Sequence, residues 1–185
     1  LLNYTRNHLT TKAVAQYVLD VANHRDARNI LYLSGHTGAD YVRDMLLHGL
    51  KSLMSDVGGV VVDYIKPRHL YDVPEGTPGG GWSNEGLYGL GYSTARRLPA
   101  ELPGEEVDRA NLSERIMKRE FDLVVFGSVH RGMLFLNEVL EVYGGGKGGI
   151  VFVDGEDMHG VCEKVKKFAG EGHYFMREIP DDCGL

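Results

Sequence analysis

Gly149-Ile150-Val151-Phe152-Val153-Asp154-Gly155-Glu156-Asp157-Met158-His159 is an apolar run that ends in three carboxylates and an imidazole within six residues. A continuous apolar run that follows glycine is typical of a strand buried on both faces, as in parallel sheets. Ligands of open parallel sheets bind just beyond the carboxyl ends of the strands. The sequence therefore predicts that residues 154–159 lie at the edge of a site.

The same pattern occurs twice more, at residues 29–38 and 121–131. Each apolar run gives way to a small residue, then to His, Ser, Thr or Arg, and then to a helical pattern. Because the carboxyl ends of parallel strands lie at one edge of a sheet, we expect a single site built from several strand ends.

Helical and strand patterns alternate along the chain. Thr10 or Thr11 can cap a first helix whose apolar face would be Val14, Tyr17, Val18 and Val21. Apolar spacing predicts a helix over 39–54, and Asn111 with Glu114 forms a capping-box pattern before another. The remaining expected elements are strands at 60–65, 123–126 and 173–176, and helices at 133–143 and 161–169.

This alternation predicts an α/β fold, a Rossmann-like three-layer sandwich with a mostly parallel sheet of about five strands. Residues 1–185 are expected to form a single domain. Residues 66–104 interrupt the rhythm with five prolines, a glycine cluster at 79–81 and the aromatic Trp82, Tyr88 and Tyr92. They are expected to be a long irregular insertion, either functional or a surface excursion that docks on its own domain.

Composition excludes several classes of function. The net charge of −6 and the pI near 5.7 argue against nucleic-acid binding, which usually requires clustered Lys and Arg. No apolar run is long enough to predict a membrane span. Cys162 and Cys183 show no disulfide or zinc-site spacing, so reduced thiols and a cytoplasmic location are expected.

Two loops at predicted strand ends carry candidate binding residues. Gly35, His36, Thr37 and Gly38 lie between a strand and a helix, where backbone N–H groups favour an anion such as a diphosphate. The alternative is that the two glycines only permit a tight turn. Ser128, His130 and Arg131 are suited to gripping phosphate oxygens or to proton transfer. The alternative is that Ser128 caps a helix beside a solvated His–Arg pair.

The third loop carries Asp154, Glu156, Asp157 and His159. Such a group can bind Mg²⁺ or Mn²⁺, hydrogen-bond a sugar or ribose, or supply a general base, although a turn of solvated carboxylates explains it nearly as well. The sequence contains no Gly-x-Ser-x-Gly elbow, HExxH pair or CxxC, so serine-hydrolase, zinc-protease and thioredoxin functions lose support.

These motifs in this order, together with Val62-Asp63-Tyr64 and Tyr174-Phe175-Met176-Arg177-Glu178, resemble a known family. Most of the chain is similar to the N-terminal domain of GT-B glycosyltransferase-like proteins of bacterial polysaccharide clusters, related to the spore-maturation CgeB type. The resemblance implies the acceptor-side half of a two-domain transferase, with a nucleotide-sugar donor or a glycan acceptor as ligand. A C-terminal donor-binding domain is its implied partner.

On this interpretation His130, Asp154 and Glu156 are the candidate catalytic residues. Gly35, His36, Thr37, Gly38, Ser128, Arg131 and Asp157 are the candidate substrate-binding residues. No metal ligand is assigned, although Mg²⁺ or Mn²⁺ is a candidate cofactor. The alternatives are a metal-dependent GT-A-type transferase, an S-adenosylmethionine-dependent transferase that uses Asp63, and a non-catalytic module that binds a ligand or a partner.

Overall fold

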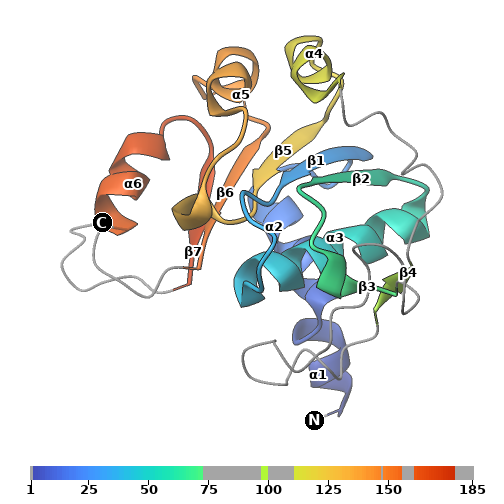
Figure 1. Cartoon of the computed structure of the whole chain (residues 1–185). Helices are drawn as coiled ribbons and strands as arrows, with labels where there is room; N and C mark the ends of the chain where they lie inside the picture. The colour runs from blue at the N-terminus through green and yellow to red at the C-terminus, as the bar shows by residue number, and fades with distance from the viewer. Residues whose placement is uncertain (1, 73–96, 100–110, 147, 156–160, 178–185) are drawn as a thin grey trace.

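The computed structural model describes residues 2–72, 97–99, 111–146, 148–155 and 161–177. Its centre is a five-stranded sheet in the order β2-β1-β5-β6-β7, in which every neighbouring pair is parallel (Figure 1). The strands are β1 (Asn29–Leu33), β2 (Val60–Tyr64), β5 (Leu123–Phe126), β6 (Ile150–Asp154) and β7 (His173–Met176). The predicted α/β, Rossmann-like sandwich is confirmed.

Helices cover both faces of this sheet (Figure 1). One face packs on α2 (Thr11–Val21) and α3 (Tyr41–Val57), and the other on α4 (Leu112–Met117), α5 (Leu136–Tyr143) and α6 (Val161–Phe168). Successive residues of a strand alternate between the faces, so Ile30 and Tyr32 join the first core while Leu31 and Leu33 join the second. Burial on both faces explains the uninterrupted apolar runs of the strands.

Strand β1 lies between β2 and β5. From β1 the chain passes through α3 to β2 on one side, and it later returns to form β5 on the other side. The loops that follow β1 and β5 therefore belong to crossovers that run to opposite faces of the sheet. A reversal of this kind is the position at which open α/β sheets bind ligands.

The first predicted helix is confirmed as α2, with the Thr10 side chain accepting a hydrogen bond from the Ala13 N–H (3.1 Å). Of its four predicted apolar-face residues only Val18 is buried, and the other three predictions are wrong. Val14, Tyr17 and Val21 are 39–61% exposed, whereas Ala15, Val18 and Leu19 are buried. The reason is that α2 packs closely against α3. A Cβ on Gly49 of α3 would lie 2.0 Å from the Thr11 carbonyl oxygen and 2.9 Å from the Ala15 Cβ. Small residues let the two backbones approach, and the larger apolar side chains lie outside this contact.

Two other helix starts differ from the prediction. Asn111 precedes α4, but its side chain makes no capping hydrogen bond, so the predicted capping box does not form. Helix α5 begins at Leu136 instead of near Met133, because Phe135 adopts a left-handed conformation (φ 58°) that a continuous helix excludes. The strand predictions at 123–126 and 173–176 are confirmed without change.

Part of the 66–104 insertion is described. A 3₁₀ turn, η1 (Arg68–Leu70), leads into β3 (Tyr71–Asp72), which pairs with β4 (Leu98–Pro99). Trp82, Tyr88 and Tyr92 lie outside the described residues. The remaining described helix, α1 (Leu2–His8), precedes α2. Among the described helices, none has the length and apolar character needed to cross a membrane.

Candidate functional site

The loops after β1 and β5 are in direct backbone contact. Gly35 has a left-handed conformation (φ 65°), and a Cβ added to it would lie 2.3 Å from the carbonyl oxygen of Gly132. The end of β6 joins them, because a Cβ on Gly155 would lie 3.4 Å from Oδ1 of Asp40. The three strand ends singled out by the sequence therefore meet at one edge of the sheet.

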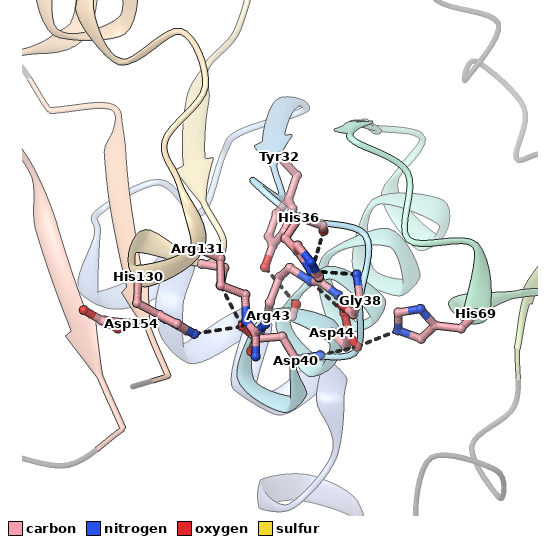
Figure 2. Close-up of polar contacts among 11 residues, drawn as sticks. Tyr32, His36, Gly38, Asp40, Arg43, Asp44, His69, His130, Arg131 and Asp154 are labelled. Atoms are coloured by element: carbon pink, nitrogen blue, oxygen red, sulfur yellow. Dashed lines mark hydrogen bonds and ion pairs between the residues drawn. The ribbon is translucent and has the colours of Figure 1, made fainter. Parts of the chain in front are cut away.

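Asp40 lies at the centre of this meeting point (Figure 2). Its Oδ1 accepts a hydrogen bond from the Arg43 N–H (3.2 Å), which caps α3. Its Oδ2 accepts one from the hydroxyl of Ser128 (2.6 Å) and lies 3.3 Å from Nε of Arg131. The Asp40 side chain is only 5% exposed. It thus ties the β1–α3 loop to the β5 loop.

His130 lies between two carboxylates. It belongs to η5 (Val129–Arg131), the short turn after β5. Its Nδ1 is 3.1 Å from Oδ1 of Asp154, and its Nε2 is 3.6 Å from Oδ2 of Asp40 (Figure 2). Because an ionised carboxylate can only accept, the first contact assigns the hydrogen to Nδ1. The second distance is too long for a hydrogen bond and joins Nε2 to a carboxylate oxygen, an ion pair only when the ring is protonated. The side chain keeps 15% exposure.

Asp154 is itself held in place. Its side chain is fully buried at the end of β6. Its Oδ2 accepts a hydrogen bond from the hydroxyl of Tyr174 (2.7 Å), and Nζ of Lys164 lies 3.9 Å from the same oxygen. The carboxylate that orients His130 therefore has its own orienting partners on the neighbouring strand and on α6.

Three backbone donors of the loop at residues 34–40 bond to groups within the loop or in the first turn of α3. The N–H of His36 donates to the Ser34 carbonyl (2.7 Å), that of Gly38 to Nδ1 of His36 (2.7 Å), and that of Asp40 to Oδ2 of Asp44 (3.1 Å). Asp40 already takes the Arg43 N–H at the start of α3. A phosphate at this loop would find these three donors occupied and would lie near the Asp40 carboxylate.

No family model, curated protein or solved structure matches this chain. The site is therefore interpreted from its geometry.

The structure brings five of the ten predicted site residues together. Gly35, Ser128, His130, Arg131 and Asp154 converge, while His36 and Thr37 are exposed on the adjacent loop. The predicted cap by Ser128 does not form, because its hydroxyl donates to Asp40 instead. Glu156, Asp157 and His159 lie outside the described residues.

Three residues were not assigned to the site from sequence. Asp40 shows only the pattern of a helix cap, and Tyr174 lies in an ordinary apolar strand. Lys164 belongs to a basic stretch of α6 that reads as a solvated face. The described residues contain no group of three or more His, Cys, Asp or Glu side chains placed to hold a metal ion.

A cavity of about 720 Å³ lies elsewhere, along the C-terminal half of α3. Its lining residues are Lys12, His48, Lys51, Ser52, Ser55, Asp56, Asp72 and 97–99. It includes none of the converging residues at the strand ends. We place the candidate site at the strand ends, because there an imidazole is oriented by a carboxylate, whereas in the cavity Lys12 and Lys51 are already paired with Asp56 and Asp63.

Proposed function

We propose that this domain supplies the general base for transfer of a sugar to a hydroxyl group, as the acceptor-side half of a glycosyltransferase-like protein. The observation that carries the proposal is the placement of His130 between Asp154 and Asp40 where the strand order reverses. An imidazole whose Nδ1–H is held by a buried carboxylate presents Nε2 as a proton acceptor.

The chemistry follows from this orientation. An acceptor hydroxyl that reaches Nε2 of His130 donates its proton there. Its oxygen then forms a bond to the anomeric carbon of a donor sugar, and the bond from that carbon to the leaving phosphate breaks. Asp154 keeps the ring in the required tautomer and stabilises the imidazolium that forms. In this scheme Asp154 is a positioning residue, and His130 alone contacts the reacting atoms.

The charges near His130 favour a neutral, hydroxyl-rich ligand. Asp40 caps α3 and pairs with Arg131, so the guanidinium is already partly neutralised. A nucleotide diphosphate would have to displace this carboxylate, whereas a sugar can hydrogen-bond to it. This agrees with the resemblance to GT-B acceptor domains, in which a second domain would bind the nucleotide-sugar.

The other transferase hypotheses have less support. The S-adenosylmethionine hypothesis needs Asp63 to reach a ribose, but its buried carboxylate accepts the Tyr71 hydroxyl (2.7 Å) and lies 3.3 Å from Nζ of Lys51. The metal-dependent GT-A hypothesis depends on Glu156, which lies outside the described residues. A non-catalytic binding module remains the contrasting outcome of the test below.

The test compares wild type with His130→Asn, and with His8→Asn on the exposed face of α1 as a matched control. Binding of glucose, N-acetylglucosamine, UDP-glucose and UDP is followed in all three proteins by melting temperature, which a ligand of the native state raises. In wild type and His8→Asn it is also followed by the His130 imidazole NMR signal. Neutral sugars are expected to move the signal, and UDP alone is not. Failure of every sugar to perturb wild type would contradict the proposal.

Turnover is the second arm. UDP release from UDP-sugars in the presence of oligosaccharide acceptors is measured for the full chain, alone and with an added GT-B donor domain. Loss of a positioned base lowers kcat by roughly 10²–10⁴-fold with little change in KM. We expect this loss in His130→Asn and none in His8→Asn. Equal turnover in both variants would remove His130 from the mechanism, and sugar binding without turnover would favour the binding module.

A further inference from the structure

A buried ionic cluster lies next to Asp40 of the candidate site (Figure 2). It consists of Arg43 and Asp44, in the first turn of α3, and His69, in η1. All three side chains are at most 1% exposed. Charged side chains are almost never fully buried unless they are paired, since leaving water costs several kcal/mol per ion. What these residues contact explains their position.

Arg43 turns back towards the loop that precedes its own helix. Its Nη1 donates to the carbonyl of His36 and its Nη2 to the carbonyl of Gly38. Its Nε and Nη2 both contact Oδ1 of Asp44, at 2.8 and 2.6 Å. The planar guanidinium thus binds two carbonyl oxygens of the loop and one carboxylate at the same time, a geometry that a lysine cannot reproduce.

Asp44 connects this clamp to a distant part of the chain. Its Oδ2 accepts the backbone N–H of Asp40 (3.1 Å) and lies 2.6 Å from Nε2 of His69. His69 belongs to the turn after β2 that leads into the 66–104 insertion. The polar contacts run from His69 through Asp44 to Asp40, whose carboxylate faces His130.

We infer that His69 is a positioning residue, which acts through Asp44 and Arg43 to hold the β1–α3 loop so that Asp40 faces His130. The inference rests on the proposed function of His130. Its physical basis is that Arg43 donates to two carbonyls of the loop and Asp44 accepts the N–H of Asp40. Replacing a buried ionic cluster by apolar residues is often neutral or stabilising, so its contribution is expected to be to geometry.

The test uses the ligand-free chain, so that it is independent of sugar binding or turnover. The ¹H–¹³C signal of the His130 ring is recorded at one fixed pH in wild type, His69→Leu and His69→Gln. Leucine removes the hydrogen-bonding nitrogen, whereas the amide N–H of glutamine can still donate to Asp44. We expect His69→Leu to displace the His130 signal and His69→Gln to return it towards the wild-type position.

Tyr71→Phe is the matched control. Tyr71 lies in β3, the strand that follows η1, and its buried hydroxyl donates to a different carboxylate, that of Asp63. The substitution removes this hydroxyl. It should lower the melting temperature and leave the His130 signal in place. A His130 signal that is unmoved by His69→Leu, or that Tyr71→Phe displaces equally, would show that the cluster is only structural.

If His69→Leu does not fold, Arg43→Lys serves as the second variant, because it keeps the positive charge and loses the several N–H donors of the guanidinium. It should displace the same signal, and an unchanged signal would overturn the inference. Because no ligand is present, failure of the proposed function would appear as absent sugar binding with these shifts intact. Failure of the inference would appear as sugar binding with no shift in any of the variants.

Discussion

Asp40 is the residue on which the contact between the β1 and β5 loops depends. One oxygen caps α3, and the other receives the Ser128 hydroxyl and lies near Arg131 and His130. The cap is a local interaction that any Asp, Asn, Ser or Thr could provide. The cross-loop contacts are tertiary, since Ser128 follows Asp40 by 88 residues.

Asp40→Ala and Asp40→Asn separate the two contributions. Alanine loses the cap, which costs about 0.5–2 kcal/mol, and leaves the buried Ser128 hydroxyl unpaired, which costs about 1–3 kcal/mol. Asparagine keeps one oxygen to cap α3 and puts an amide N–H at the other position, where the Ser128 oxygen can accept instead of donating. It also loses the partly exposed ion pair with Arg131, worth less than about 1 kcal/mol. Urea unfolding should therefore rank wild type above Asn, and Asn well above Ala. Equal losses in the two variants would contradict this account.

At the scale of elements, the packing of α2 against α3 decides which side of α2 is buried. A helix with apolar residues over much of its surface can be buried through more than one stripe, and periodicity does not choose between them. Gly49 determines which stripe of α2 is buried, because its missing side chain leaves room for the Thr11 carbonyl and the Ala15 methyl group. Val14, Tyr17 and Val21 are left partly exposed as a result.

Gly49→Ala tests this packing. In an exposed helix the substitution would stabilise by about 0.5–1 kcal/mol through propensity. Here the new Cβ would meet a backbone oxygen at 2.0 Å, so the helices must separate. Overpacking typically costs about 1–3 kcal/mol, so we expect net destabilisation in urea unfolding. Ser55→Ala, at an exposed position of the same helix, is the control and should lose no stability. A stabilised Gly49→Ala would show that α2 and α3 can shift without cost.

At the scale of the whole molecule, the candidate site residues that the structure describes lie at the carboxyl ends of the strands, and none of them lies at the amino ends. His24 lies at this other end, before β1, and burial lowers its pKa below the ordinary value of 6.5, with a further lowering from nearby His173 and an opposing effect of Asp122. The folded protein therefore resists protonation of this ring.

This shift predicts a pH dependence of stability. A histidine whose pKa is lowered by folding binds fewer protons in the folded state than in the unfolded state, so the free energy of unfolding rises with pH. The contribution is fully present above the unfolded pKa of about 6.5 and is lost as the pH falls through the folded pKa. In thermal unfolding between about pH 7 and about pH 5, His24→Gln should show a shallower decline than wild type.

His8→Gln, on exposed α1, is the control and should keep the wild-type slope. An unchanged slope in His24→Gln would assign the pH dependence to other groups.

Local patterns were sufficient for the strands and for the class of fold. The residues at 123–126 and 150–153 are apolar at every position and all are buried, and that pattern needs no tertiary context. His130 and Asp154 were assigned to the site because they are polar residues at the ends of these strands. The predicted capping box at Asn111 does not form, because the backbone of Asn111 (φ −103°, ψ 22°) is not in the extended conformation that is typical of an N-cap residue.

By itself the sequence determined that the chain forms a parallel α/β sheet and that its strand ends carry an imidazole and carboxylates. It did so because hydrophobic periodicity and strand-end chemistry are short-range properties. Only the tertiary structure decided that β1 lies between β2 and β5, and therefore that Asp40 contacts Ser128 and lies near His130. It also decided that Arg43, Asp44 and His69 are buried together next to Asp40. These contacts join segments far apart in the chain, and their energies depend on burial and geometry that no local pattern encodes.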